Sequence, residues 1–386
     1  MKVVHVYRTY FPDPPGGLQE AIRQIALSTR RYDVESRVFT LSPEPEPTYL
    51  ARDEALVVRE RCWAAPASCD LGGVAAFRRY RELAAWADIV HFHFPWPFAD
   101  ILHLLGRTRK PTVMTYHSDI VRQKWLGAVY NPLMRRTLRT MSAVVATSHA
   151  YARTSPILTE YVPSGRLRTI PLGIDDYRDM HHAVPLEQSR PVLKALSGRP
   201  FFLALGVLRY YKGLHTLIEA AATVDAPIVI AGSGPEQANL LSLADRLGAR
   251  NVVFAGQVSD DEKRMLLDSC RALVLPSHLR SEAFGMVLVE AEMFAKPIVC
   301  CEIGSGTSYV NEDQVTGFVV PPEQPRALAD AVNRLLADDA LATRMGKAAR
   351  ARYERLFSGE ALGRSYGALY REVAHEWGAA AFGGEQ

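Results

Sequence analysis

Short apolar runs rich in β-branched residues alternate along this chain with longer amphipathic runs, and this alternation constrains the fold more than any other feature. It is typical of parallel sheets that carry helices on both faces. The runs form two series. Strands are expected at 2–7, 35–41, 55–60, 88–94, 111–116, 143–148 and 167–172, and then at 201–206, 227–232, 251–256, 271–277 and 296–302. The sequence therefore predicts an α/β protein with two doubly wound domains.

A break separates the two series of strands. Residues 173–200 lack a strand-like apolar run and are rich in proline, histidine and charge, which is typical of a linker. The expected domains are 1–185 and 186–358, followed by helical spacing of apolar residues over 324–377. A chain of 386 residues has room for two such cores, so ligands are expected in a cleft between them.

Several compartments and ligand classes are disfavoured by composition. No run approaches the roughly 18 to 20 apolar residues of a membrane span. The opening MKVVHVYRTYF is interpreted as a first strand and not as a signal peptide. Five cysteines, none at zinc-ligand spacing, are expected as reduced thiols. These features predict a cytoplasmic protein with no nucleic-acid partner and no bound metal.

Positive charge is concentrated in the first half of the chain. Residues 1–190 carry 25 Lys and Arg against 19 Asp and Glu, whereas residues 191–386 carry 20 against 23. The stretch 122–139 favours contact with an anionic membrane surface or a phosphorylated lipid, although a half-buried helix with a solvated basic face explains it equally well. Its cations and apolar residues are Arg122, Lys124, Arg135, Arg136 and Arg139, with Trp125, Leu126, Tyr130 and Leu133.

Ligands of open α/β sheets bind beyond the carboxyl ends of the strands, so functional residues are expected in the loops there. Gly16 and Gly17 follow the first strand and open a helix near Leu18, where backbone amides can approach a phosphate. Arg209 and Lys212 follow the strand 201–206 and could clamp a diphosphate. A plain turn and exposed loop cations remain the alternatives.

A G-x-G element follows the strand 227–232. Gly232 and Gly234 are included among the residues expected to bind the donor, but a dinucleotide fingerprint would need a further glycine where this chain has Gln237. The element therefore weighs against an NAD site, and Pro235 at the start of a helix explains much of it.

The stretch SEAFGMVLVE, residues 281–290, places Glu282 and Glu290 at the two ends of an apolar run. A buried helix is expected over 284–295, and eight helical positions cover at most roughly 12 Å, about the span of a diphosphate with a sugar on each side. Glu282 is expected to meet hydroxyls of one sugar, and Glu290 those of a ribose. The phosphates are expected to meet the amides of Phe284, Gly285 and Met286.

With these motifs in place, the chain resembles the retaining glycosyltransferases of family four, which have the GT-B fold of two Rossmann-like domains facing across a cleft. The E-x7-E element of Glu282 and Glu290 is the most specific part of the resemblance. The other matching segments are FPDPPGG, TYHSDIVRQ, ATSHAY, PLGID, YYKGLHTLIEA, GSGPE, FAGQVSDDEK, LPSHLRSEAFGMVLVEAEMFAKPIV and GFVVPP.

The resemblance also implies roles for residues. The first domain would bind the acceptor and the second the nucleotide sugar, with His117 and Glu282 as catalytic residues. The implied positions are Gly16 and Gly17 near the donor diphosphate and acceptor, His117 beside the transferred sugar, Arg209 and Lys212 on the diphosphate, and Val258 beside the base.

Two further points follow from the family pattern. The family usually has an arginine where this chain has Val207, and Arg209 is the candidate to replace its charge. The family also implies a last helix that crosses back to the first domain, expected at 359–378. No Asp-x-Asp element is present, which favours a site where cations and helix dipoles, without a metal or other cofactor, neutralise the leaving diphosphate.

The predicted function is transfer of mannose or rhamnose from a GDP-linked donor, with retention, to a lipid-linked or saccharide acceptor of bacterial surface polysaccharide at the inner face of the membrane. Front-face displacement is favoured, and double displacement through a carboxylate is the alternative. A GT-B-fold nucleotide-sugar epimerase and a non-catalytic nucleotide-sugar-binding protein remain the alternative functions.

Overall fold

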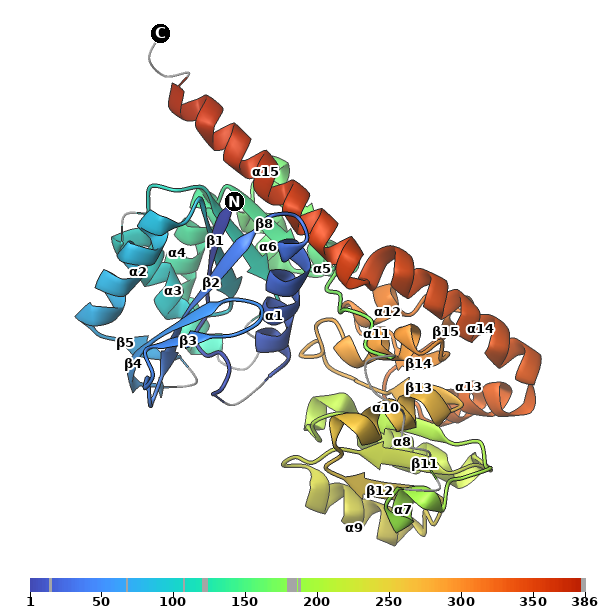
Figure 1. Cartoon of the computed structure of the whole chain (residues 1–386). Helices are drawn as coiled ribbons and strands as arrows, with labels where there is room; N and C mark the ends of the chain where they lie inside the picture. The colour runs from blue at the N-terminus through green and yellow to red at the C-terminus, as the bar shows by residue number, and fades with distance from the viewer. Residues whose placement is uncertain are drawn as a thin grey trace. The chain divides into compact units, whose positions relative to one another are not determined.

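The computed structural model describes residues 1–13, 16–66, 69–106, 108–119, 124–178, 186 and 189–382 (Figure 1). Contacts divide the chain into two compact units, which are described separately below: Met1–Asp175 with Gly359–Gln386, and Asp176–Ser358. The boundary at Asp175 falls inside the predicted linker 173–200, whereas the predicted boundary at residue 185 lies outside the described residues.

The first unit contains a nine-stranded sheet in the order β3-β4-β2-β1-β6-β7-β8-β9, with β5 paired to β4. All pairs are parallel except those of β3 and β5 with β4. The sequence missed β3 and β5, because two or three residues carry no periodic signal. The strands are β1 (Lys2–Val6), β2 (Glu35–Ser42), β3 (Tyr49–Ala51), β4 (Leu56–Ala64), β5 (Leu71–Gly72), β6 (Ile89–Phe94), β7 (Thr112–Tyr116), β8 (Ala143–Ala146) and β9 (Leu167–Thr169).

Helix α15 belongs to this first unit although it follows the second unit in the chain, which confirms the predicted return of the last helix. It lies beside α1 (Figure 1), and the two helices share an apolar core with Val3, Ile89 and Val113 of the sheet. The helices are α1 (Gly17–Arg30), α2 (Val74–Trp86), α3 (Pro97–Leu105), α4 (Lys124–Thr140), α5 (His149–Thr154), α6 (Pro156–Tyr161), η2 (Ser164–Arg166) and α15 (Gly359–Phe382). None of the described helices is both long and apolar enough to cross a membrane.

The second unit contains a six-stranded, fully parallel sheet in the order β12-β11-β10-β13-β14-β15. Its strands are β10 (Phe202–Leu205), β11 (Ile228–Ala231), β12 (Val252–Gly256), β13 (Ala272–Leu275), β14 (Ile298–Cys301) and β15 (Gly317–Val320). Of these, only β15 was missed from the sequence. The helices are α7 (Pro191–Lys194), η4 (Tyr210–Lys212), α8 (Leu214–Ala220), η5 (Ala221–Thr223), α9 (Gln237–Leu247), α10 (Asp260–Ser269), α11 (Met286–Met293), α12 (Thr307–Val310), α13 (Pro325–Ala337), α14 (Asp339–Arg352) and η6 (Tyr353–Phe357).

Three glycines recur every four residues along one face of α15, where the helix approaches the end of α1. A β-carbon added to Gly363 would lie 2.3 Å from the carbonyl oxygen of Ser28, and one added to Gly367 would lie 3.1 Å from the β-carbon of Tyr32. One on Gly359 would overlap the Asp175 carboxylate. The absence of side chains at these positions therefore allows α15 to pack closely on α1.

We expect Gly363→Ala to lower the free energy of unfolding by about 1–3 kcal/mol, because the new methyl group forces the two helices apart. The matched control is Gly378→Ala on the same helix, where a β-carbon meets nothing within 4 Å. That change should raise stability by up to about 1 kcal/mol through helix propensity. Urea unfolding of both variants checks the prediction, and equal stabilisation by the two substitutions would contradict it.

Glu292 on α11 is a buried carboxyl group that the sequence did not single out. The residue is 0% exposed, and neither carboxylate oxygen has a hydrogen-bond partner within the described part of the chain. Burial raises its pKa well above the usual value, opposed by Arg352 and reinforced by Glu312. The folded protein therefore keeps a proton on Glu292 at pH values where the unfolded chain has released it.

Glu292→Met should raise the free energy of unfolding by about 1–3 kcal/mol by removing the unsatisfied group. The gain should be larger at pH 8 than at pH 5. The reason is that folding raises the pKa of this carboxyl group. The wild-type protein therefore loses stability as the pH rises above the unfolded-state pKa of about 4.3. Chemical unfolding at both pH values measures the gain, and a gain independent of pH would show that Glu292 is ionised in the folded protein.

Candidate active site

The candidate ligand site of the second unit lies at the carboxyl edge of its sheet. Because β10, β11, β12 and β13 are parallel, the loops that follow them leave the same edge, and open α/β sheets bind ligands there. These loops and the helix α11 contain every residue predicted for donor binding in this half of the chain: Arg209, Lys212, Gly232, Gly234, Val258, Glu282, Phe284, Gly285, Met286 and Glu290.

Helix α11 begins at Met286 and ends at Met293, so the predicted span 284–295 was too long at both ends. Gly285 precedes the helix with φ 82° and ψ 65°, a left-handed conformation that side chains rarely adopt. A β-carbon there would also crowd Leu288 at 3.1 Å. The free amides of the first helical turn therefore start at Met286, and the amide of Phe284 precedes the helix. These amides and the helix dipole favour an anion at this point.

Lys212 and Glu282 meet at this edge. The Lys212 Nζ donates to Glu282 Oε2 at 2.8 Å, and the two side chains are only 12% and 13% exposed. Burial lowers the pKa of Lys212, but the charge of Glu282, its hydrogen bond to Lys212 and the nearby Tyr211 together outweigh burial, so the pKa of Lys212 lies above its usual value. Lys212 is therefore a cation held in one position by Glu282, as a phosphate ligand requires.

Glu290 forms the second carboxylate–lysine pair at the site. Its Oε1 accepts from Lys263 Nζ at 2.9 Å and from the Tyr177 hydroxyl at 3.0 Å. Burial and the charge of Glu290 both raise the pKa of Tyr177, which keeps its proton for this bond. Sequence reasoning assigned no role to Tyr177 or Lys263, although Lys263 is the last residue of the FAGQVSDDEK segment.

Arg209 is exposed at the start of η4, and the neighbouring Val207 is 51% exposed. The positive charge of Arg209 acts to lower the pKa of Lys212, so the two cations lie close enough to interact electrostatically. Arg209 also lines a small cavity with Tyr210 and His215 from the η4–α8 segment and with Glu236 beside α9. Lys212 is not among the residues that line this cavity.

Gly232 and Gly234 have a packing role that the sequence did not show. A β-carbon on Gly232 would lie 2.1 Å from the Gly206 carbonyl oxygen, and one on Gly234 would lie 2.5 Å from that of Leu208. Both glycines therefore let the loops after β10 and β11 lie against each other. Val258 is half-buried between β12 and α10, just before the capping box of Ser259 and Glu262. The binding roles of Gly232, Gly234 and Val258 remain predictions.

In the first unit, the predicted site residues lie at the start of α1 and after β7. Gly16 caps α1, which begins at Gly17 and therefore one residue before the predicted Leu18, and both glycines are exposed. His117 directly follows β7 and is 6% exposed. Its Nε2 lies 3.1 Å from Nδ1 of His93, and burial lowers the pKa of His117 to about 3. His117 is therefore a neutral hydrogen-bonding group at neutral pH.

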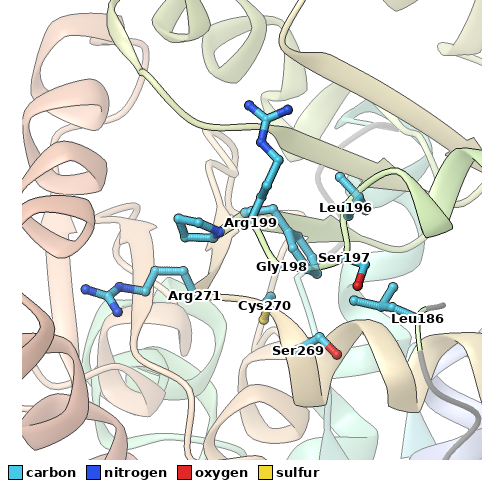
Figure 2. A pocket seen from close by; sticks show the side chains of 10 residues that line it. Leu186, Leu196, Ser197, Gly198, Arg199, Ser269, Cys270 and Arg271 are labelled. Carbon is cyan, nitrogen blue, oxygen red and sulfur yellow. The ribbon is translucent and has the colours of Figure 1, made fainter.

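A separate cavity of the second unit, shown in Figure 2, lies away from this edge. Arg199 and Phe201 in its lining precede β10, and Arg271 precedes β13, so the cavity is at the amino ends of the strands. Arg271 donates from Nε to the carbonyl oxygen of Leu335. The cavity contains none of the residues predicted for donor binding.

The basic stretch predicted to meet a membrane falls mainly on α4. Arg122 lies outside the described residues, as do the side chains of Lys124, Trp125 and Leu126. Arg135 stacks on the Tyr161 ring with 4.1 Å between its Cζ and the ring centroid. The Arg135 guanidinium therefore makes a contact within the first unit. Arg136 and Arg139 are exposed.

Comparison with known proteins is consistent with this geometry. Residues 15–178 match the family model Glycosyltransferase Family 4, and residues 187–352 match Glycosyl transferases group 1. The chain is 44% identical over 358 residues to D-rhamnosyltransferase WbpZ of Pseudomonas aeruginosa, covering 93% of this chain and 92% of that protein. It is 39% identical over 370 residues to O-antigen chain mannosyltransferase C of Escherichia coli, covering 96% and 98%.

Solved structures share the fold. The structure of HepE from Anabaena in complex with UDP superposes with a TM-score of 0.78 at 20% identity, covering 96% of this chain and all of that one. Sucrose-phosphate synthase from Thermosynechococcus elongatus superposes with a TM-score of 0.76 at 22% identity, covering 96% and 98%. The chain therefore belongs to the glycosyltransferases with two Rossmann-like domains of the GT-B type, with a family 4 region in its first unit and a group 1 region in its second.

Proposed function

We propose that this glycosyltransferase transfers a mannosyl or D-rhamnosyl group from a GDP-linked donor to a saccharide or lipid-linked acceptor of a bacterial surface polysaccharide. The identities of 44% and 39% to a D-rhamnosyltransferase and an O-antigen mannosyltransferase, each over more than nine-tenths of the chain, support the sugar and the acceptor class. The geometry that supports transfer from a nucleotide diphosphate is the Lys212–Glu282 pair beside the first turn of α11.

The second unit would hold the donor. The amides at the start of α11, with Lys212 and Arg209, would bind the diphosphate and stabilise the negative charge that develops on it as the sugar departs, without a metal. Glu282 would accept a hydrogen bond from a sugar hydroxyl. Glu290 accepts hydrogen bonds from Tyr177 and Lys263 through Oε1, and it would accept hydrogen bonds from the ribose hydroxyls through Oε2.

The reaction would retain the anomeric configuration by front-face displacement. The bond between the anomeric carbon and the phosphate oxygen breaks, the acceptor oxygen bonds to the same face of that carbon, and the departing phosphate takes the acceptor proton. His117, which follows β7 and is uncharged at neutral pH, would hydrogen-bond to the transferred sugar. A trapped glycosyl-enzyme adduct in any variant would instead support double displacement.

Thermal shifts with GDP, UDP, ADP and TDP test the donor, because a ligand at one hundred times its dissociation constant stabilises the folded protein by about 2.7 kcal/mol. GDP should give the largest shift.

Lys212→Met should abolish the shift and lower kcat/KM for GDP-mannose or GDP-rhamnose by about 100-fold or more. The control is Arg326→Met, which removes an exposed cation from α13 of the same unit. An equal loss in both variants, or a UDP shift above that of GDP, would reject this assignment.

Membrane contact is the second part of the proposal and rests on the exposed cations of α4. Arg136→Glu with Arg139→Glu should weaken sedimentation with anionic vesicles, at about 1 kcal/mol per cation removed from the surface. Arg78→Glu with Arg81→Glu on α2 makes the same charge change at exposed positions of the same unit. Binding that falls equally in both double variants would show non-specific electrostatics, and unchanged binding would reject α4 as the contact.

A further inference from the structure

Four histidines lie in one buried layer of the first unit. His5 is on β1, His91 and His93 are on β6, and His117 follows β7. Their exposures are 0%, 0%, 1% and 6%. Register pairs His5 with His91 on adjacent strands, and residues two apart on a strand share a face, so the rings lie on the side of the sheet that α15 covers. Buried imidazoles are costly unless their nitrogens have partners.

Three of the four histidines form a continuous hydrogen-bonded chain. His5 Nδ1 lies 3.1 Å from His93 Nε2, and His93 Nδ1 lies 3.1 Å from His117 Nε2. The far end is Ser36 on β2, whose hydroxyl oxygen lies 3.5 Å from His5 Nε2. The chain therefore crosses the sheet from β2 to the candidate catalytic residue His117.

His91 belongs to the same layer but not to this chain. Its Nδ1 lies 2.7 Å from the Tyr370 hydroxyl of α15, and its Nε2 lies 2.7 Å from the Thr115 hydroxyl. The Thr115 hydroxyl in turn lies 2.8 Å from that of Tyr366, also on α15. His91 is therefore a natural control, because it is as buried as His93 and its ring centroid is only 4.3 Å away.

A metal site is the alternative use of these residues, since one nitrogen from each of His5, His91 and His93 lies within 4.8 Å of the others. Both nitrogens of all three rings already have a hydrogen-bond partner among the described residues. A metal would need to displace these bonds in a layer where every ring is buried. The geometry favours the hydrogen-bonded chain.

The charge state of the chain limits its proton arrangements to two. Burial lowers the pKa of His5 to about 3 and that of His93 well below its usual value, so each ring is neutral with one N–H and one lone pair. Either every ring carries its proton on Nδ1 and Ser36 donates to His5, or every ring carries it on Nε2 and Ser36 accepts. The second arrangement leaves the hydroxyl proton of Ser36 without an acceptor among the described residues, at 6% exposure.

We propose that His93 and His5 are positioning residues that hold His117 in its Nδ1–H tautomer, so that His117 presents a neutral hydrogen-bond donor to an oxygen of the bound donor substrate. The nitrogen concerned is His117 Nδ1, because His117 Nε2 already has His93 as its partner. A sugar hydroxyl or a phosphoryl oxygen can accept this bond, and a phosphoryl oxygen could not donate one. This inference rests on the proposed function, which places His117 beside the transferred sugar.

The test compares His93→Phe with His91→Phe in the full-length protein. Nitrogen NMR of the histidines in the substrate-free protein should show His117 as the Nδ1–H tautomer in the wild type and in His91→Phe. In His93→Phe it should show a mixture of tautomers, with kcat lowered about tenfold or more and the donor KM little changed. His93→Asn, which restores a donor toward His117, should recover part of kcat.

The outcomes separate this inference from the proposed function. An Nε2–H tautomer for His117 in the wild type, or equal losses of kcat in His93→Phe and His91→Phe after correction for folded fraction, would overturn the positioning role. If the tautomer result holds but no GDP-linked hexose is transferred, the proposed substrate is wrong and the histidine chain stands. If His93→Phe does not fold, His93→Leu, which also removes the donor toward His117, takes its place, and an unchanged pure Nδ1–H tautomer in that variant would overturn the positioning role.

Discussion

Parallel strand pairing is the constraint on which the functional residues of both units depend. In a parallel sheet every strand ends at the same edge, so residues far apart in sequence leave the sheet together. Lys212 after β10 and Glu282 after β13 are 70 positions apart, yet they meet at 2.8 Å. In the first unit the same geometry aligns β1, β6 and β7, which places the histidines in one layer.

The two units offer different chemistry. The second unit supplies charge: two lysines, each fixed by a glutamate, beside a helix start whose amides favour an anion. Fixing the lysines before a ligand arrives reduces the reorganisation that charge stabilisation would otherwise need. The first unit supplies neutral hydrogen-bonding groups, because burial keeps the His117 ring uncharged. Under the proposed function, this neutral ring would hydrogen-bond to a hydroxyl of the sugar and Lys212 would bind the diphosphate.

The sequence predicted the two sheets because most strands are apolar runs of four or more residues between helices of clear periodicity. It missed β3 and β5, which are too short for a pattern, and β15, whose run GFVV was read only as a family segment. It placed Glu282, Glu290 and Lys212 at the site. It predicted neither the pairing of Lys212 with Glu282 nor Lys263 as the partner of Glu290, because a partner 70 or 27 positions away leaves no signal in a local pattern. The predicted start of α11 was wrong, because the left-handed conformation of Gly285 cannot be predicted from the neighbouring residues.

The histidine layer also shows why the last helix of the chain returns to the first unit. Tyr366 and Tyr370 of α15 complete the hydrogen bonds of Thr115 and His91, which would otherwise be unsatisfied groups inside the core. The helix can come close enough because glycines face α1 at its near end. His91 thus connects α15 to the sheet, whereas the hydrogen bond to His117 comes from His93. A segment far from the first unit's sheet in sequence completes the polar part of its core through hydrogen bonds alone.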